Sequence, residues 1–327
     1  MAKRLNVDEL ADKAAIGRGI EPEEALFLAS PDCPFDGLMA GAERVRKAHF
    51  GQEASLCGII NARSGACTSD CRYCAQSAHV KTGAPLYPLL DPDRILSEAK
   101  ALAGAGVRCF GIVTSGPGAT PAEVRSVAEA VRRIKAETRM EVSASLGMLG
   151  EDSLRLLKEA GTDRYHHNLE TSREFFPQIC TTHSWDARLA TLRRAQAAGL
   201  ELCSGGLFGM GESWADRISL ALALRGLDVR SVPINFLNPV PGTPLGSRPL
   251  MAAEEALRLV ALFRFLLPLA TLRICGGRAV TLGERQRDIF KAGANAFMTG
   301  NYLTTPGALP ASDLSWAREE GMHIETR

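Results

Sequence analysis

The pattern of hydrophobic and polar positions divides the chain near residue 50. Before that point, apolar residues recur at helical spacing over residues 7–16, 22–29 and 35–49, and no alternating strand pattern interrupts them. We therefore expect residues 1–50 to form a helical N-terminal cap that precedes the main fold.

The remainder, residues 51–327, alternates apolar runs of strand length with helical periods. In the stretch 92–105, for example, Ile95, Ala99 and Leu102 fall on one helix face. Eight strand–helix units in series predict an α/β fold, a parallel (β/α)8 barrel of the TIM type, with its chemistry at the carboxyl ends of the strands. The expected strands are residues 56–61, 108–114, 140–146, 164–169, 201–208, 231–237, 271–276 and 294–299.

The composition excludes some classes of protein. Of the 327 residues, 46% are hydrophobic, which suffices for one large barrel core. A net charge of +1 and a pI near 7.6 provide no basic surface for nucleic acid or anionic lipid. The most apolar run, residues 257–272, carries Arg258, Arg264 and Pro268, and therefore predicts a buried helix that ends near Pro268 rather than a membrane span.

Cysteine usage predicts a reducing compartment. The chain has nine cysteines, and its first eight residues lack the apolar core of a secretion signal. In a reducing compartment clustered thiols indicate metal binding rather than disulfides, so we expect a cytoplasmic protein.

Three of these cysteines, Cys67, Cys71 and Cys74, lie within eight residues in the pattern C-x3-C-x2-C, directly after the first expected strand. Thiolates are the ligands of iron–sulfur clusters, and so short a loop can turn three sulfurs toward one centre. Three protein ligands leave one iron of a four-iron cluster open to a small molecule. A structural zinc site is the alternative, but it needs a fourth ligand that the loop does not supply.

This spacing resembles the cluster loop of the radical S-adenosylmethionine (SAM) superfamily, in which SAM chelates the open iron. Further stretches resemble the biotin synthase family in the same order along the chain, and the likeness extends from about Asp8 to Thr305. These stretches are residues 61–67 with Cys74-Ala75-Gln76-Ser77, then Tyr165-His166-His167-Asn168-Leu169-Glu170-Thr171, Cys203-Ser204-Gly205-Gly206, Pro233-Ile234-Asn235-Phe236-Leu237, Gly242-Thr243-Pro244-Leu245 and Arg273-Ile274-Cys275-Gly276-Gly277-Arg278.

The resemblance implies a radical SAM sulfurtransferase that converts dethiobiotin to biotin. One electron cleaves SAM at a 4Fe–4S cluster held by Cys67, Cys71 and Cys74, and the resulting 5′-deoxyadenosyl radical removes hydrogen from dethiobiotin. The carbon radical then takes sulfur from an auxiliary iron–sulfur cluster. Because a primary radical is unselective, positioning and the exclusion of water must provide the specificity. The family also implies a flavodoxin- or ferredoxin-type electron donor and a homodimer.

His166, Asn168 and Glu170 alternate along the fourth expected strand and therefore share one face. A barrel interior does not collect three polar side chains without partners, because each unpaired buried group costs about 1–3 kcal/mol. By resemblance, Asn168 and Glu170 bind the ribose hydroxyls of SAM and His166 borders the substrate; a satisfied buried polar network is the alternative. The better-known branch of the family has Asn and Asp where this chain has His166 and Glu170.

Three further residues receive roles by the same resemblance. Asn235 offers a donor and an acceptor together, which suits the ureido group of dethiobiotin, although an Asn can also cap a loop locally. Arg188 contacts the SAM carboxylate, and Tyr73 covers the cluster and the adenine. A solvated arginine and plain aromatic packing are the respective alternatives.

The auxiliary cluster is where this chain departs from the common branch, which holds a 2Fe–2S cluster with three cysteines and an arginine. The corresponding positions here are Gly111, Ser143, Cys203 and Arg273, so two thiols are absent. Other cysteines stand nearby on the expected strands. A shift of two residues keeps the same strand face, so Cys109 and Cys275 can still point inward.

We therefore expect Cys57, Cys203 and Cys275, together with Cys109 and Arg273 as the weakest members, to hold a larger, four-iron auxiliary cluster. The alternative for each cysteine is a plain core residue. That alternative is our expectation for Cys33 and Cys180, which lie off the expected strands.

Two other functions remain open on the sequence alone. Another radical SAM barrel enzyme, such as a hydrogenase-cluster maturase or a methylornithine synthase, needs no sulfur donor deep in the barrel. A non-catalytic barrel that binds iron or zinc would never cleave SAM.

Overall fold

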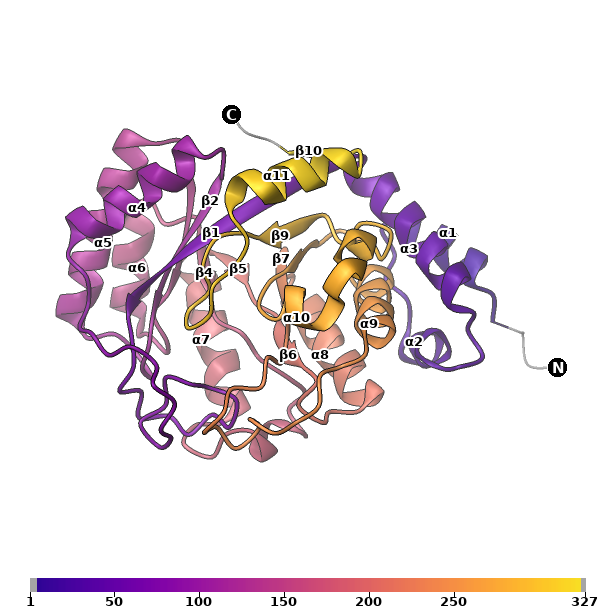
Figure 1. The fold of residues 1–327 in the computed structure, drawn as a ribbon, viewed down its shortest axis with the longest axis horizontal. Coiled ribbons are helices and arrows are strands. Elements are labelled where there is room, and N and C mark those ends of the chain that lie inside the picture. Colours follow the sequence, from indigo (N-terminus) through magenta and orange to yellow (C-terminus); the bar gives the residue numbers. More distant parts are fainter. Residues whose placement is uncertain (1–4, 325–327) are drawn as a thin grey trace.

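The expected alternation of strands and helices forms a closed parallel barrel. The structure is a computed structural model that describes residues 5–324. Strands pair in the order β1, β2, β3, β4, β5, β7, β8, β9, and β9 pairs with β1 to close the barrel (Figure 1). The predicted (β/α)8 architecture is confirmed. The strands are β1 Glu53–Arg63, β2 Cys109–Thr114, β3 Glu141–Ser145, β4 Arg164–His166, β5 Glu201–Cys203, β6 Gly206–Phe208, β7 Ser231–Phe236, β8 Thr271–Ile274, β9 Ala296–Met298 and β10 His323–Ile324.

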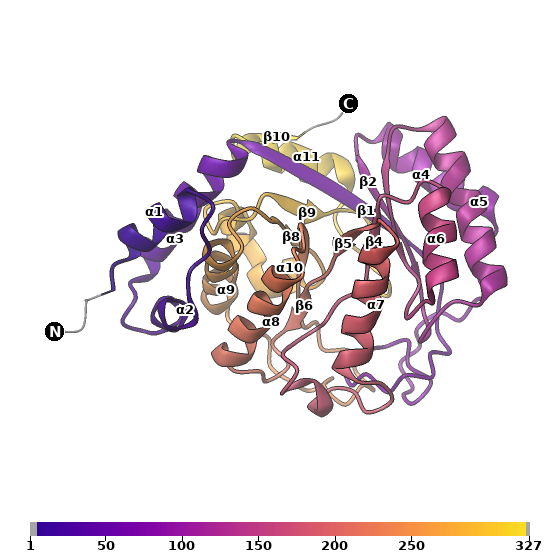
Figure 2. The ribbon, with the colours of Figure 1, turned by 180° about the vertical axis from the view of Figure 1, so that it is seen from behind.

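Helices cover the outside of the barrel (Figures 1 and 2). Five of the described helices begin at an N-cap whose side chain accepts a hydrogen bond from the first turn, namely Asn6, Asp91, Thr120, Ser184 and Ser213. The helices are α1 Val7–Ala15, α2 Pro22–Ala29, α3 Phe35–Phe50, α4 Pro92–Gly104, α5 Pro121–Glu137, α6 Glu151–Glu159, α7 Trp185–Ala197, α8 Trp214–Gly226, α9 Ala253–Leu266, α10 Arg278–Leu282 and α11 Pro310–Glu319, with 3-10 turns η1 Phe176–Gln178 and η2 Gly283–Ile289.

Seven of the eight expected strands are shorter in the structure than the pattern suggests, whereas β1 is longer, and two of the shortened strands bear on the site. The strand expected over residues 164–169 ends at His166, and Glu170 adopts a left-handed φ of 70°. The strand expected over residues 201–208 divides into β5 and β6, and β6 pairs with β7. The division falls at Gly205, where an added Cβ would lie 1.8 Å from the carbonyl oxygen of Pro233. The chain passes so close to β7 there that only glycine fits.

The helices of residues 7–50 lie against α9 on the outer surface of the barrel, as both ribbon views show (Figures 1 and 2). Nη1 of Arg258, on α9, donates to the carbonyl oxygens of Leu28 and Cys33, both at 3.1 Å, and the amide of Ile20 donates to Phe265. At the other end of the chain, β10 pairs with β1 at Glu53. Of the polar C-terminal stretch 307–327, residues 310–319 form α11. Within the described part of the chain, every helix falls short of the length and apolarity that crossing a bilayer requires.

Candidate active site

The inside of the barrel holds a cavity of about 310 Å³, which we call the upper cavity, and the loops at the carboxyl ends of the strands contribute to its wall. Its polar lining includes His166, Asn168, Glu170, Asn235 and Arg273, and its thiols are Cys57, Cys74, Cys203 and Cys275. Apolar side chains such as Ile59, Val113, Leu207 and Leu237 complete the wall. One space therefore receives polar groups, thiols and a largely apolar surface from segments far apart in the sequence.

The loop of residues 64–91, which follows β1, carries the three clustered cysteines. Within the loop, the side-chain oxygen of Gln76 accepts hydrogen bonds from Ser64 Oγ at 3.0 Å and from the Gly65 amide at 3.2 Å. The Cys67 amide donates to the Gln76 carbonyl oxygen at 3.1 Å. These bonds fold the loop back on itself. Cys67, Cys71 and Cys74 are free thiols there, and Cys74 reaches the upper cavity.

Asp70 fastens this loop to the segment that leads into α7. Its carboxylate accepts hydrogen bonds from the Thr181 amide at 2.9 Å, from the Thr182 amide at 3.1 Å and from both threonine hydroxyls. Burial raises the pKa of Asp70, but the hydrogen bonds from Thr181, Cys180 and Thr182 outweigh it and hold that pKa well below its usual range. The cluster loop and the start of α7 are therefore joined by an ionised carboxylate.

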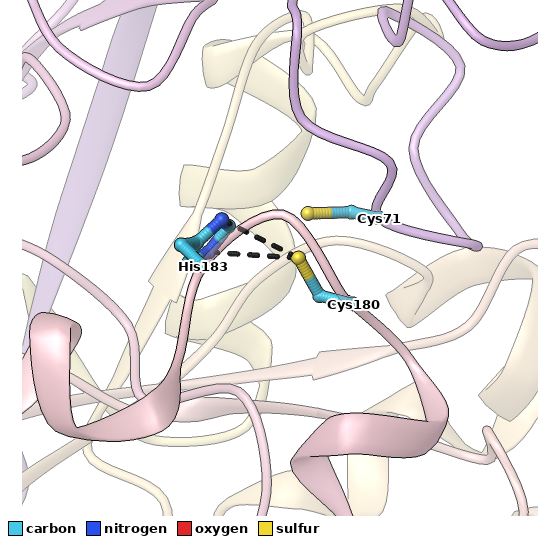
Figure 3. Close-up of side chains that lie close together, drawn as sticks. All are labelled: Cys71, Cys180 and His183. Atoms are coloured by element: carbon cyan, nitrogen blue, oxygen red, sulfur yellow. Dashed lines mark hydrogen bonds between the residues drawn. The ribbon is translucent and has the colours of Figure 1, made fainter.

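Cys180 and His183 also lie beside the cluster loop, a placement that the sequence did not predict. Ligand atoms of Cys71, Cys180 and His183 lie within 4.8 Å of one another (Figure 3). Nε2 of His183 accepts from Arg188 Nε at 3.0 Å, so Nδ1, 3.3 Å from Cys180 Sγ, carries the proton. The hydrogen bond with Cys71 lowers the pKa of Cys180 to about 4. Cys180 is buried, as expected of a core residue, and its thiol also lies beside Cys71 and His183.

His166, Asn168 and Glu170 do share one face, although β4 ends before two of them. The side-chain oxygen of Asn168 accepts from the Gly205 amide at 3.0 Å, and its amide nitrogen donates to Glu170 at 3.4 Å. Nδ1 of His166 lies 3.3 Å from Cys203 Sγ. Burial lowers the pKa of His166, but the Cys203 thiol opposes burial and the net pKa is raised.

Arg188, on α7, lies behind Asn168 and Glu170, outside the lining of the upper cavity. Its Nη1 donates to the carbonyl oxygen of Asn168 at 2.8 Å and lies 3.8 Å from the Glu170 carboxylate. It is 12% exposed and therefore not a solvated surface arginine. Tyr73, by contrast, lines the cavity beside Cys74.

Asn235, on β7, lines the upper cavity and also holds two backbone segments together. Its amide nitrogen donates to the Gly206 carbonyl oxygen at 3.1 Å, and its side-chain oxygen accepts from the Gly276 amide at 3.0 Å. A side-chain amide has two N–H donors and two acceptor lone pairs, so one of each is left for a ligand. The local capping role and a ligand-binding role are therefore compatible.

The thiols expected at the auxiliary cluster line two cavities of the barrel. Cys57, Cys203 and Cys275 face the upper cavity together with Arg273, whereas Cys109 lines a second cavity closer to the amino ends of the strands. The two-residue shift from Gly111 did keep Cys109 on the inward face, where it lies beside Cys57, its register partner on β1. Burial raises the pKa of Cys203, and the charge and hydrogen bond of His166 then lower it to about 7. Burial raises the pKa of Cys275 to about 12.

Comparison with known families agrees with this geometry. The sequence matches the Radical SAM superfamily over residues 62–224 and the Biotin and Thiamin Synthesis associated domain over residues 233–323. Among solved structures, a methylornithine synthase superposes with a TM-score of 0.82 at 21% identity, covering 96% of this chain and 97% of that one. A maturase of the FeFe-hydrogenase superposes with a TM-score of 0.83 at 17% identity, covering 97% and 75%. At these identities the likeness concerns the fold alone.

Curated relatives are far more similar in sequence. The biotin synthase of Trichlorobacter lovleyi is 50% identical, over 97% of this chain and 96% of its own length. The biotin synthase of Syntrophotalea carbinolica is 49% identical, over 94% of this chain and 95% of its own length. The chain therefore belongs to the biotin synthase family of the radical SAM superfamily, as its sequence motifs predict.

Proposed function

We propose that this chain converts dethiobiotin to biotin in the upper cavity, where SAM and dethiobiotin bind side by side. Membership of the family supports the reaction. The position of the upper cavity supports it as the site of the reaction, because (β/α)8 barrels carry out their chemistry at the carboxyl ends of the strands. The observation that carries the proposal is that one cavity is faced both by Cys74 of the cluster loop and, deeper in the barrel, by Cys203 and Cys275.

The donor sets fit the two clusters that the family implies. Cys67, Cys71 and Cys74 are free, soft ligands on one folded loop and are our proposed ligands of the 4Fe–4S cluster. Cys57, Cys203 and Cys275 are the proposed ligands of the auxiliary cluster. When bound, the first cluster supplies the electron that cleaves SAM and the second supplies the sulfur that closes the ring.

We propose four irons for the auxiliary cluster because the cavity is open where the common branch has two cysteines. Gly111 and Ser143 line the upper cavity at those positions, and both side chains are smaller than cysteine. The space they leave suits a cluster larger than 2Fe–2S. Cys109 lines the second cavity beside Cys57 and is the weakest candidate ligand among the thiols.

SAM is held, in this proposal, by Asn168, Glu170 and Tyr73. The Glu170 carboxylate accepts one hydrogen bond from Asn168 and lies 3.8 Å from the Arg188 guanidinium. The remaining lone pairs of this carboxylate can accept hydrogen bonds from the two ribose hydroxyls of SAM. Arg188 positions Asn168 and Glu170 from behind, and a direct contact with the SAM carboxylate would require its side chain to turn toward the cavity.

Dethiobiotin is held by Asn235 and His166 in the same proposal. The free N–H and lone pair of Asn235 match the carbonyl and N–H groups of the ureido ring. The apolar wall around them excludes water, which would otherwise compete for hydrogen bonds and quench a radical intermediate.

The test is an anaerobic assay with dethiobiotin, SAM and a reductant. Biotin formation is the expected result. Cleavage of SAM without biotin would instead favour another radical SAM reaction, and no SAM cleavage at all would favour a non-catalytic metal-binding barrel. We also propose a cytoplasmic homodimer that receives electrons from a flavodoxin- or ferredoxin-type protein; sedimentation of the reconstituted protein tests the dimer.

A further inference from the structure

Three potential metal ligands from two distant segments meet beside the cluster loop. Ligand atoms of Cys71, Cys180 and His183 lie within 4.8 Å of one another (Figure 3). The first belongs to the loop that follows β1, and the other two belong to the segment that leads into α7. We call these three residues the Cys2His group. Only Cys71 has a role in the function proposed above, so the group offers that thiol a second set of partners.

The separations within the Cys2His group fit one tetrahedral ion. Zinc binds thiolate sulfur at about 2.3 Å and imidazole nitrogen at about 2.0–2.1 Å, so two ligand atoms on the same ion stand about 3.5–3.8 Å apart. Sγ of Cys180 lies 3.3 Å from Nδ1 of His183 and 3.8 Å from its Nε2. The Cys71 sulfur lies within 4.8 Å of both partners. Small side-chain movements would therefore bring all three atoms onto one ion.

Cys180 and His183 also have the spacing of ligands on a tight turn. Two residues separate them, as in the C-x2-C pairs of structural zinc sites. Asp70 holds the turn, since its carboxylate accepts from the amides of the intervening Thr181 and Thr182 at 2.9 and 3.1 Å. The turn is thus fixed before an ion arrives, which reduces the conformational entropy that binding would cost.

The Cys2His group is buried but lies close to the surface. Cys71 is 8% exposed and Cys180 is 3% exposed, whereas His183 is half-buried and both Thr181 and Thr182 are exposed. An ion can therefore enter from the side of the turn. Three protein ligands leave a fourth position to water. Thiolate and imidazole ligands select zinc or ferrous ions over magnesium and calcium, which prefer oxygen.

An ion on His183 would displace Arg188. Nε2 of His183 accepts a hydrogen bond from Arg188 Nε at 3.0 Å. A neutral imidazole carries one proton, so an ion on Nδ1 would move that proton to Nε2, and an ion on Nε2 would occupy the accepting lone pair. The bond from Arg188 is lost in both cases. Because Arg188 also donates to the Asn168 carbonyl oxygen at 2.8 Å, an occupied ion site would loosen the wall of the proposed nucleoside site.

We propose that Cys71, Cys180 and His183 bind one zinc or ferrous ion in the cluster-free chain. Binding releases the two thiol protons to solvent and leaves His183 neutral. Because Cys71 is also a proposed ligand of the 4Fe–4S cluster, the single ion and that cluster exclude each other. The ion must leave Cys71 before the cluster is complete, and His183 then accepts from Arg188 again. The exclusion rests on the proposed function above, whereas the ion site does not.

Cobalt(II) tests the ion site, because tetrahedral cobalt bound to thiolates has intense visible bands and a sulfur-to-cobalt charge-transfer band. The full-length chain is freed of iron by a chelator under anaerobic, reducing conditions and titrated with Co²⁺, and Zn²⁺ then displaces the cobalt. We expect the first equivalent to give the tetrahedral thiolate spectrum. Cys180→Ser and His183→Gln should each weaken binding of the first Zn²⁺ at least about tenfold, since even the loss of a second-shell partner costs about 10–100-fold.

Cys67→Ser and Cys203→Ser are the matched controls. Cys67 lies on the same loop as Cys71 but outside the Cys2His group, and Cys203 faces the upper cavity. Both variants should bind the first Zn²⁺ as tightly as the wild type. The denaturation midpoints of the metal-free proteins are compared as well, and of Cys180→Ser and His183→Gln the variant that keeps the wild-type value decides.

Two results would overturn the ion site. The first is an octahedral cobalt spectrum for the first equivalent in the wild-type protein. The second is a loss of affinity in Cys67→Ser or Cys203→Ser with none in Cys180→Ser, because the ion would then bind to the three loop cysteines or to the thiols of the upper cavity.

The exclusion is tested by cluster assembly on the full-length chain. One equivalent of Zn²⁺ should slow the appearance of the 4Fe–4S absorption several-fold in the wild type, whereas Cys180→Ser should assemble the cluster at the same rate with and without Zn²⁺. Equal slowing in the two proteins would overturn the exclusion. If neither protein forms the cluster without Zn²⁺, the proposed function fails instead, and the cobalt spectra still decide whether the ion site exists.

Discussion

At the scale of single residues, the site combines groups whose roles follow from what each touches. Cys203 is buried, lies 3.3 Å from His166 and faces the same cavity as Cys57 and Cys275. The sequence predicted this inward face, because alternation along a strand settles the direction of a side chain. The sequence did not predict how deep in the barrel each side chain lies. A shift of two residues along a strand keeps the side chain on the same face but moves it along the barrel axis. Cys109 lines a different cavity from the group in which it was expected, although it pairs in register with Cys57.

Replacing Cys203 by Ala should remove the auxiliary cluster and leave the cluster on the loop. The reason is that Cys203 faces Cys57 and Cys275 across the upper cavity, while Cys67, Cys71 and Cys74 are on a separately folded loop. Iron and sulfide per chain should fall after anaerobic reconstitution, and SAM cleavage should persist. Cys33→Ala is the control, because Cys33 is fully buried beside the N-terminal helices. Unchanged iron in Cys203→Ala would refute its role as a ligand.

Cys180 and His183 show what the sequence could not reveal. Their position beside Cys71 depends on the return of residues 180–183 to a loop more than a hundred residues earlier, which no local pattern encodes. The one available signal was their spacing, since Cys180 and His183 are three residues apart directly before a helix whose N-cap is Ser184. Long-range contacts of this kind come from the barrel topology.

At the scale of elements, the loops at the carboxyl ends of the strands are as closely specified as the strands. Glu170 holds a left-handed φ directly after β4, and its carbonyl oxygen accepts from the Leu207 amide at 2.9 Å. Strand length was the feature that sequence predicted least well. The apolar pattern continues through residues 164–169 and 201–208, but the chain leaves the barrel wall at Glu170 and Gly205, where it forms the site.

Gly205→Ala should strongly destabilise the protein. The added methyl would overlap the Pro233 carbonyl oxygen at 1.8 Å, and this oxygen belongs to the backbone and cannot turn away as a flexible side chain could. We expect a loss of at least about 3 kcal/mol in unfolding free energy, at the upper end of single-residue effects. Gly104→Ala is the matched control, since Gly104 closes α4 and nothing lies within 4 Å of its added Cβ. That variant should be neutral or slightly stabilising, and equal denaturation midpoints for the two would contradict the steric argument.

The start of α8 provides a prediction about pH. Asp216 accepts hydrogen bonds from Ser213, the N-cap residue of α8, and from Ser172 Oγ at 2.5 Å. Burial raises the pKa of Asp216, but the bonds from Ser172 and Ser213 outweigh it, so the net pKa is lowered. A carboxyl with a depressed folded pKa contributes stability above its unfolded pKa, near 3.9, and loses that contribution as the pH falls through the folded value.

Asp216→Asn should therefore cost about 1 kcal/mol at neutral pH and progressively less below about pH 4. Urea denaturation of both proteins at neutral pH and in acid measures the difference. A deficit that stays constant down to the acid limit of the folded protein would show that ionisation of Asp216 contributes nothing.

At the scale of the whole molecule, the partly buried Arg258 on α9 joins the N-terminal helices to the barrel. Nη1 of Arg258 donates to the carbonyl oxygens of Leu28, Ser30 and Cys33, and its guanidinium lies 5.7 Å from the Phe35 ring centroid. Each carbonyl would lack this donor if Arg258 were removed. The sequence predicted the helices themselves, but not that they lie against α9 on the outer surface.

Arg258→Met should consequently cost about 2–4 kcal/mol, because it leaves several acceptors unsatisfied. Limited proteolysis should then cleave before residue 50 faster than in the wild type. Arg285→Met is the matched control, because Arg285 also lies over the Phe35 ring, at 5.2 Å, but pairs with Asp288 instead of these carbonyls. If both variants were equally resistant to protease, the carbonyl contacts would not be what holds this segment.

The hydrogen bonds that Asp70 accepts from Thr181 and Thr182 have a consequence for the order in which the enzyme acquires its metal and its substrates. The carboxylate ties the loop of the three cysteines to the residues that begin α7, and α7 carries Arg188 behind the proposed nucleoside site. Any rearrangement of the loop on acquiring iron is therefore transmitted to the wall of that site. We expect the protein to recognise SAM well only once its metal is in place, so that maturation precedes substrate recognition.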